Sequence, residues 1–373
     1  MRKRIVAEIN LSALKRNYKK IAAKVKPAKV LSVLKANAYG LGVGDYAAAL
    51  YEAGCRDFGV ADPYEALELK RIFRGKPVVV QILSSILPDE IFEMVKAGIV
   101  LPVIDLKTAK LISAAAVKLG KTARVQFKID SGMGRLGIPC ANALEVIAAV
   151  EKLPRLDCEG ILTHCPVADA PENNYTAVQI RRFSDLISEA QKLGYTFRKR
   201  HLAASAAINH FPAAAKAPFN YVRAGIDLHG GFDEEGLKKL PLEPTITLKA
   251  RIAQIRELPA QTTIGYNRTY KLARRAKIAT IAAGYADGVP LALTNCGRVI
   301  VKGKLCPIVG RISMDYTTVD VSSVKALKAG DEVLFFGKAG GVSLTPAEWA
   351  AKKGTHAWDI LCSLGPRIEF RRR

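Results

Sequence analysis

Residues 29–40 read Lys-Val-Leu-Ser-Val-Leu-Lys-Ala-Asn-Ala-Tyr-Gly. The first six residues, Lys29–Leu34, form a short run rich in valine and leucine, which is typical of a buried strand. Lys35 follows directly, where such a strand would leave the core. In barrels of alternating strands and helices, catalytic residues lie at the carboxyl ends of the strands. Lys35 is therefore a candidate functional residue.

Seven more runs of this kind lie within the first 225 residues. They are Phe58–Ala61, Val78–Leu83, Ile99–Ile104, Arg124–Ile129, Cys158–Thr163, Arg200–Ala203 and Tyr221–Gly225. Segments with helical periodicity separate them, for example Asp62–Phe73 and Ala141–Leu153. Eight strands that alternate with helices predict an α/β fold, a (β/α)8 barrel of the TIM type. A doubly wound sheet is the competing architecture, but no glycine-rich dinucleotide turn follows the first strand.

The sequence pattern changes near residue 238. Lys238–Pro244 has the composition of a linker, and the strand-like runs beyond it predict a mainly β domain. These runs are Thr245–Ile255, Lys277–Ala282, Arg298–Val301, Tyr316–Val321 and Glu332–Phe336. We therefore predict a barrel over residues 12–237 and a mainly β C-terminal domain over residues 238–373. Residues 1–11 contain an extended stretch, Arg4–Leu11, that is expected to pair with the second domain.

The composition is that of a folded protein. Apolar residues make up 49% of the chain and charged residues 24%, so general disorder is excluded. No apolar run approaches the ~20 residues that cross a bilayer. The basic start, Met1–Arg4, is not followed by the apolar core of a signal peptide. We expect a cytoplasmic protein without a membrane segment.

The formal net charge is +23, and such an excess can mark a nucleic-acid-binding protein. Here the basic groups are not interleaved with aromatic residues, and no helix-turn-helix or RNA-binding signature accompanies them. We interpret the charge as a solvated surface and expect no specific nucleic acid partner. The seven cysteines include no CxxC pair, which excludes a standard zinc site and a complete disulfide framework. No bound metal is expected.

The residues after Lys35 carry a family resemblance. Lys35–Gly40 reads Lys-Ala-Asn-Ala-Tyr-Gly and resembles the cofactor-lysine motif of the alanine racemases. Further matches follow in the same order along the chain, at Glu8–Leu11, Gly132–Gly137, Gly160–His164, His201–Ala207, Val222–Ile226, Gly284–Gly288 and Arg311–Asp315. Each motif alone is weak, but the set is specific and covers nearly the whole chain. The resemblance implies a pyridoxal 5′-phosphate enzyme built on a barrel.

The resemblance also implies roles at the mouth of the barrel. Lys35 would hold the cofactor covalently and act as one base, for which its pKa must fall below ~10.4. His164 would lie against the pyridine ring, and Arg223 would donate a hydrogen bond to the ring nitrogen. Because a guanidinium accepts no proton, the ring would be a weaker electron sink, which suits racemisation over transamination. The implied phosphate ligands are Tyr39, Ser205 and the backbone amides of Gly225 and Ile226.

Racemisation needs a second base on the opposite face of the cofactor. Tyr266 matches that base, which the partner subunit contributes in this family, so the resemblance implies a homodimer with shared active sites. Arg135 and the backbone of Met314 match contacts to the substrate carboxylate, and Tyr285 lines the same entrance. Lys128 matches a lysine that is often carbamylated in the family, where the added negative charge orients the arginine.

Four positions depart from the usual family pattern. Leu41 stands where histidine is common, Ala204 replaces asparagine, His229 replaces tyrosine, and Pro366 falls near the place of a phosphate-binding tyrosine. None of them is Lys35 or Tyr266, so the implied reaction is unchanged. Cofactor affinity and substrate range are left open.

The leading interpretation is a racemase that interconverts L- and D-alanine and supplies D-alanine for peptidoglycan. A racemase of the same mechanism with broad specificity, or one for serine or basic amino acids, is the nearest alternative. A fold-related pyridoxal-phosphate decarboxylase would need a catalytic cysteine from a partner chain, and Tyr266 and the Met314 motif argue against it. A non-catalytic pyridoxal-phosphate carrier ordinarily lacks the second domain. A nucleic-acid-binding protein rests on charge alone.

Overall fold

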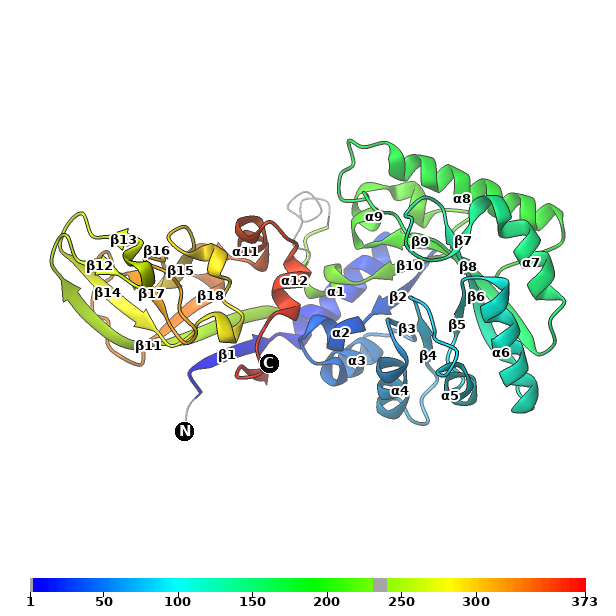
Figure 1. The fold of residues 1–373 in the computed structure, drawn as a ribbon, viewed down its shortest axis with the longest axis horizontal. Coiled ribbons are helices and arrows are strands. Elements are labelled where there is room, and N and C mark those ends of the chain that lie inside the picture. The colour runs from blue at the N-terminus through cyan, green and yellow to red at the C-terminus, as the bar shows by residue number, and fades with distance from the viewer. Residues whose placement is uncertain (1–2, 231–239) are drawn as a thin grey trace.

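The computed structural model describes residues 3–230 and 240–373. Two domains follow one another along the long axis of the molecule (Figure 1). The first is built from strands wrapped in helices, and the second mainly from strands. The boundary predicted between residues 237 and 238 lies outside the described residues.

Eight parallel strands form the first domain. They are β2 (Lys29–Val33), β3 (Asp57–Val60), β4 (Val79–Ile82), β5 (Leu101–Val103), β6 (Ala123–Asp130), β8 (Leu156–Leu162), β9 (Lys199–Ala204) and β10 (Tyr221–Ala224). Their order is β4-β3-β2-β10-β9-β8-β6-β5, and each neighbouring pair is parallel. A bridge between Gln81 and Val100 joins the two ends of this sheet. Each of the eight predicted runs is a barrel strand, and the predicted fold class is confirmed.

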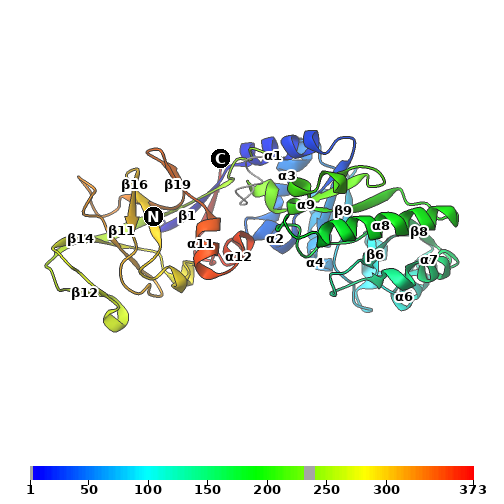
Figure 2. The same ribbon diagram turned by 90° about the horizontal axis from the view of Figure 1, so that it is seen from above.

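Helices surround the barrel, as Figures 1 and 2 show. They are α1 (Leu11–Lys24), α3 (Val43–Glu52), α4 (Pro63–Ile72), α5 (Ile91–Ala97), α6 (Leu106–Lys118), α7 (Ala143–Glu151), α8 (Tyr175–Lys192) and α9 (Ser205–His210), with the short elements α2 (Lys35–Tyr39), β7 (Ile138–Pro139), η1 (Cys140–Asn142), η2 (Pro212–Ala215) and η3 (Ile226–His229). The start of α4 shows how the sequence determines where a helix begins. Asp62 caps the helix by accepting a hydrogen bond from the amide of Glu65 at 3.1 Å, and Pro63 occupies the first turn.

The second domain is a mainly β structure, as predicted. Its main sheet contains β1 (Ile5–Ile9), β11 (Ile246–Leu258), β14 (Ala276–Ile281), β15 (Arg298–Val301), β16 (Lys304–Pro307), β17 (Thr317–Asp320), β18 (Glu332–Ala339), β19 (Val342–Leu344) and β20 (Glu369–Arg372). A hairpin of β12 (Thr263–Ile264) and β13 (Tyr270–Lys271) surrounds η4 (Tyr266–Arg268), and η5 (Tyr285–Asp287), η6 (Leu291–Leu293), α11 (Pro346–Lys353) and α12 (Ala357–Cys362) complete the domain.

Both ends of the described chain lie in this second sheet. β1 pairs antiparallel with β11 and parallel with β20, and the chain enters the barrel through α1. The domains also meet where α12 packs against α2. A side chain at Gly40 would place its Cβ 2.9 Å from the carbonyl oxygen of Leu361, so only glycine fits at this contact. One apolar core continues through both domains.

Candidate active site

Lys35 opens α2, a segment with left-handed backbone geometry. Ala36, Asn37, Ala38 and Tyr39 have φ between 52° and 59°. Left-handed geometry costs about 1–2 kcal/mol for each residue that carries a Cβ, so the surroundings must hold this turn in place. Strain concentrated directly after a candidate catalytic lysine is a recognised mark of a functional site.

One side chain from another helix and one from the turn itself stabilise the turn. The carboxylate of Glu65 accepts hydrogen bonds from the amide of Ala36 and, at 2.8 Å, from the amide of Ala61. The side-chain oxygen of Asn37 accepts a hydrogen bond from the amide of Val43 at 2.8 Å. These contacts attach the turn to the end of β3 and to the start of α3.

Positive charge gathers around Lys35. Desolvation and the charge of Arg135 lower the pKa of the Lys35 ammonium group. Lys128 is buried on β6 and donates to the carbonyl oxygens of Leu83 and Ser84. Desolvation, followed by the charges of Arg223, Arg135 and Lys35, lowers the pKa of Lys128 to about 8. Four cations close enough to influence one another favour an anionic ligand.

Arg223 is buried in β10, and its hydrogen-bond acceptors are neutral groups. It donates to the carbonyl oxygens of Thr163, Leu202 and His201 and to the Nδ1 atoms of His164 and His201. Because the guanidinium only donates, both Nδ1 atoms carry lone pairs. Desolvation and the charge of Arg223 lower the pKa of His164 to about 3, so this ring is neutral.

A cradle of small and hydroxyl-bearing residues lies at the ends of β9 and β10. The hydroxyl of Ser205 accepts hydrogen bonds from the amides of Gly225 at 3.1 Å and Asp227 at 3.3 Å. A Cβ on Gly225 would lie 2.3 Å from the hydroxyl of Tyr39, so the glycine makes room for the phenol. Tyr39 and Ser205 are both buried, and Ile226 follows Gly225 at the start of η3.

Tyr266, Tyr285 and Met314 form a second group, on the C-terminal domain. Their exposed fractions are 70%, 43% and 53%, which is unusual for side chains of this size. Gly265 lies against the backbone of Arg311, and the amides of Tyr285 and Ala286 donate to the carbonyl oxygens of Ser313 and Met314. The loops that carry these three residues are therefore neighbours on one edge of the domain.

Within one chain, the hairpin that carries Tyr266 lies away from the turn that carries Lys35. In both views the β12–β13 hairpin, which carries Tyr266, lies at the end of the C-terminal domain away from the barrel, whereas α2 lies at the junction (Figures 1 and 2). The barrel carries Lys35, Tyr39, Lys128, Arg135, His164, Ser205, Arg223, Gly225 and Ile226, and the C-terminal domain carries Tyr266, Tyr285 and Met314.

Among the described residues, no helix combines the length and the apolar character needed to cross a membrane. Within residues 3–230 and 240–373, no cluster of three or more histidine, cysteine, aspartate or glutamate side chains could hold a metal ion. The seven cysteines are unpaired.

Two family models match the chain. Residues 9–233 match the alanine racemase N-terminal domain, and residues 245–372 match the alanine racemase C-terminal domain. The chain belongs to the alanine racemase family. The alanine racemase of Desulforamulus reducens is 40% identical over 372 residues, which cover 99% of this chain and 98% of that protein. The alanine racemase of Methanococcus maripaludis is 35% identical and covers 98% of this chain and 97% of its own length.

Solved alanine racemases share the whole architecture. The enzyme of Streptomyces lavendulae aligns with a TM-score of 0.92 and 31% identity, covering 100% of this chain and 98% of that one. The Bartonella henselae alanine racemase, solved with covalently bound pyridoxal phosphate, aligns over the full length of both chains with a TM-score of 0.90 and 29% identity. The family predicted from the motifs is confirmed.

The structure adds site residues that the motifs did not reveal. Glu65 supports the turn of Lys35, and His201 holds Arg223, although the sequence assigned neither of them a role. α12 brings Cys362 close enough to Lys35 for their charges to interact. Asp62 and Glu65 have the spacing of a helix cap, which places Glu65 in the first turn of α4, but only the folded barrel shows that its carboxylate reaches α2.

Of the four residues that depart from the family pattern, His229 contacts a proposed cofactor ligand, Tyr39. Its ring lies edge-on to the ring of Tyr39 with centroids 4.9 Å apart, and Nδ1 is 3.3 Å from the hydroxyl of Tyr46. Leu41 is fully buried, and Ala204 ends β9. Pro366 precedes Arg367, which pairs with Asp287 and Asp315.

Proposed function

We propose that this chain interconverts L-alanine and D-alanine with pyridoxal 5′-phosphate as its cofactor. The observation that carries the proposal is the convergence at one barrel mouth of Lys35, the buried guanidinium of Arg223 and the cradle of Tyr39, Ser205 and Gly225. The relatives named alanine racemase support the choice of substrate. The barrel would extend over residues 12–237 and the second domain over residues 238–373.

The residues of the mouth fit the cofactor. The Gly225 backbone and the Ser205 hydroxyl suit a phosphate, because glycine permits close approach and the surrounding cations favour an anion. Tyr39 reaches the same cradle, and the amide of Ile226 would be a further donor. The lowered pKa of Lys35 increases the share of neutral amine that can bond to an aldehyde. When bound, pyridoxal phosphate draws electrons from the substrate and acidifies its α-proton.

The chain's own residues would set the outcome of that chemistry. Arg223 would donate to the ring nitrogen, and His164, neutral and fixed against Arg223, would lie along the ring. Lys35 would take or return the α-proton on one face, and desolvation and the charge of Arg135 favour this role because they lower its pKa. Arg135 would bind the substrate carboxylate.

We infer that the active enzyme is a homodimer with shared sites. The β12–β13 hairpin, which carries the proposed second base Tyr266, lies away from α2, which begins with Lys35, so a partner would supply Tyr266 (Figure 1). The exposed edge formed by Tyr266, Tyr285, Leu291, Met314 and Tyr316 is an apolar surface of the kind that a second copy covers. The backbone of Met314 and the side chain of Tyr285 would then line the entrance of the partner's barrel.

Lys128 would be carbamylated. Its nitrogen would attack the carbon of CO2, form an N–C bond and release one proton to solvent, leaving a carboxylate on the side chain. A pKa of about 8 provides the neutral amine that this reaction needs. The new negative charge would neutralise part of the surrounding cluster and orient Arg135. In the cell, the enzyme would act in the cytoplasm and supply D-alanine for peptidoglycan.

A racemisation assay across a panel of amino acids tests this function. The purified protein, supplied with pyridoxal phosphate, is incubated separately with L-alanine, L-serine, L-lysine and L-arginine, and the D enantiomer is measured. We expect kcat/KM to be highest for alanine, and the yellow colour of the bound cofactor to bleach with borohydride. A higher value for serine or a basic amino acid would assign the alternative substrate. Absence of racemisation with every substrate would overturn the proposal.

A further inference from the structure

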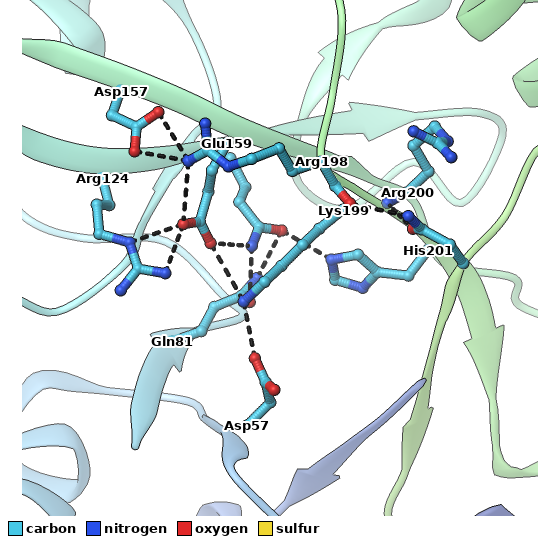
Figure 3. Close-up of polar contacts among 11 residues, drawn as sticks. Asp57, Gln81, Arg124, Asp157, Glu159, Arg198, Lys199, Arg200 and His201 are labelled. Carbon is cyan, nitrogen blue, oxygen red and sulfur yellow. Dashed lines mark hydrogen bonds and ion pairs between the residues drawn. The ribbon is translucent and has the colours of Figure 1, made fainter. Parts of the chain in front are cut away.

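A line of buried polar side chains connects Arg223 to strands on the other side of the barrel. Figure 3 shows the part of this line around His201 and Glu159. The line runs from Arg223 on β10 through His201 on β9 and Gln126 on β6 to Glu159 on β8. His201, Gln126 and Glu159 are at most 1% exposed. We call these four residues the interior column. Buried polar groups of this kind are stable only when each one is satisfied.

All hydrogen bonds of the interior column point in one direction. Arg223 donates to Nδ1 of His201 at 3.0 Å, so the proton of the neutral ring lies on Nε2. That nitrogen donates to the side-chain oxygen of Gln126 at 2.7 Å. The amide nitrogen of Gln126 donates to Glu159 at 3.0 Å. The donors thus run from the guanidinium to the carboxylate without a reversal.

Gln126 is locked in this orientation. It exchanges two hydrogen bonds of 3.0 Å with Gln81, which leaves its amide with a full set of partners. Gly160 provides the space, since a Cβ there would lie 2.9 Å from the amide carbon of Gln126. A flipped amide would set its oxygen against the Glu159 carboxylate and its N–H groups against the protonated Nε2 of His201. The carboxylate therefore decides which way the amide points.

The carboxylate of Glu159 lies close to three cations, of which Arg198, at 3.8 Å, is the most distant. Its oxygens lie 2.6 Å from a guanidinium nitrogen of Arg124 and 3.3 Å from the ammonium nitrogen of Lys199, which also pairs with Asp57 at 2.7 Å (Figure 3). A carboxylate oxygen accepts hydrogen bonds from amide N–H groups, and Glu159 accepts one from Gln126. Burial, followed by the charges of Arg223 and Lys199, lowers the pKa of His201 well below its usual value. His201 is therefore neutral, and its one ring proton lies on Nε2, between the ring and Gln126.

We propose that Glu159 is a positioning residue for Arg223: through Gln126 it selects the tautomer of His201 whose Nδ1 lone pair holds the guanidinium at the barrel mouth. The inference rests on the proposed function in one respect, the role of Arg223 toward the cofactor. The opposite tautomer would place an N–H on Nδ1 against a guanidinium N–H, and Arg223 would have to move. A displaced guanidinium would weaken catalysis without removing any group that binds alanine.

The Glu159→Gln variant tests the selection directly. A glutamine must turn its NH2 group toward either Gln126 or Arg124, so one donor faces another and the amide of Gln126 is free to reverse. Protein labelled with ¹⁵N-histidine and free of cofactor is measured by NMR, and the His201 signals are assigned by their loss in His201→Gln. We expect one tautomer, protonated on Nε2, in the wild type and a mixture of both tautomers in Glu159→Gln.

The matched control is Asp157→Asn. Asp157 lies on the same strand and pairs with Arg198 in the same ion cluster, but it does not contact Gln126. This variant should retain the single tautomer. In the loaded enzyme, Glu159→Gln should lower kcat by about 10- to 100-fold with KM for alanine changed less than about twofold, the pattern of a misplaced group. Asp157→Asn should change neither value.

Gln126→Leu keeps the proposal testable if Glu159→Gln does not fold, because it cuts the interior column and leaves the ion pairs of Glu159 in place. It should reproduce the loss in kcat. A single Nε2-protonated His201 in Glu159→Gln, or a wild-type kcat in Gln126→Leu, would overturn the inference. If the wild type racemises no amino acid, the proposed function is overturned instead. The tautomer measurement on cofactor-free protein would then still decide whether Glu159 selects the tautomer of His201.

Discussion

The carboxylate of Glu65 accepts a hydrogen bond from the backbone amide of Ala36, the residue after Lys35. Its other oxygen accepts from the amide of Ala61 at 2.8 Å. Ala36 has a φ of 52°, so this contact holds a strained part of the chain. Glu65 thus connects the end of β3 to the turn that positions Lys35.

Replacing Glu65 with glutamine should loosen this turn. The amide of glutamine has one oxygen, so its NH2 group must face one of the two backbone N–H donors. We expect a loss of about 1–3 kcal/mol in the free energy of unfolding, measured with urea, and weaker binding of pyridoxal phosphate. Glu68→Gln, an exposed position on the same helix, is the control and should change stability by less than about 0.5 kcal/mol. Equal stability of the two variants would contradict the role of Glu65.

Much of the barrel could be predicted because its strands are short apolar runs between amphipathic segments. Lys29–Leu34 differs from β2 by one residue at its end, and Arg124–Ile129 from β6 by one residue at each end. The interior column could not be predicted. Gln126 and Glu159 are polar residues within or beside strand-like runs, and their partners lie 33 to 75 positions away in the sequence. Only the closed barrel, with its register, brings them into contact.

At the candidate site, too, the motifs predict which residues take part but not the backbone geometry that positions them. The motifs predict roles for Lys35, Arg223 and Tyr266 from their neighbours in the sequence, but they carry no information about the left-handed turn after Lys35. A pattern of residue types does not encode a φ above zero at Ala36 or Ala38, because alanine itself disfavours that geometry. The distant position of Tyr266 also depends on where the β12–β13 hairpin lies, which tertiary structure alone determines.

Lys128 should give the cofactor-free enzyme an unusual dependence of stability on pH. Its pKa falls from 10.5 to about 8 on folding, so the folded state binds fewer protons than the unfolded state between these values. Stability in CO2-free buffer should therefore rise with pH in that window, by about 2 kcal/mol between pH 7 and pH 10 from this group. Lys128→Met should remove that share of the rise.

Urea unfolding of both proteins at several pH values measures the difference, and the variant corrects for the other titrating groups. Added ¹³C-bicarbonate should give a carbamate signal by NMR in the wild type and none in Lys128→Met. Parallel stability curves for the two proteins would show that Lys128 does not titrate as described.

Lys35→Ala should abolish racemisation, and mixing two inactive variants should restore part of it. If Tyr266 acts across the subunit interface, a heterodimer of Lys35→Ala and Tyr266→Phe contains one site with both bases intact. Random exchange of equal amounts makes half of the dimers mixed, so about a quarter of the wild-type activity should return. Exchange is followed with a fluorescent label on one variant. Complete exchange without any recovered activity would rule out a shared site.

The two bases should also be separable by isotope exchange, because Tyr266→Phe removes a hydroxyl and leaves the ring. If Lys35 serves D-alanine and Tyr266 serves L-alanine, the variant keeps one of the two proton paths. General acid–base loss lowers rates by about 10²–10⁴-fold, and overall racemisation should fall by that order. In deuterated water, the α-proton of D-alanine should still exchange at near the wild-type rate through Lys35, whereas exchange from L-alanine should fall with the overall rate.

The control is Tyr270→Phe, which changes a tyrosine on β13 of the same hairpin and should alter neither exchange rate. A residue that only shapes the entrance would slow both enantiomers alike, so equal exchange rates in Tyr266→Phe would exclude a role for Tyr266 as a base.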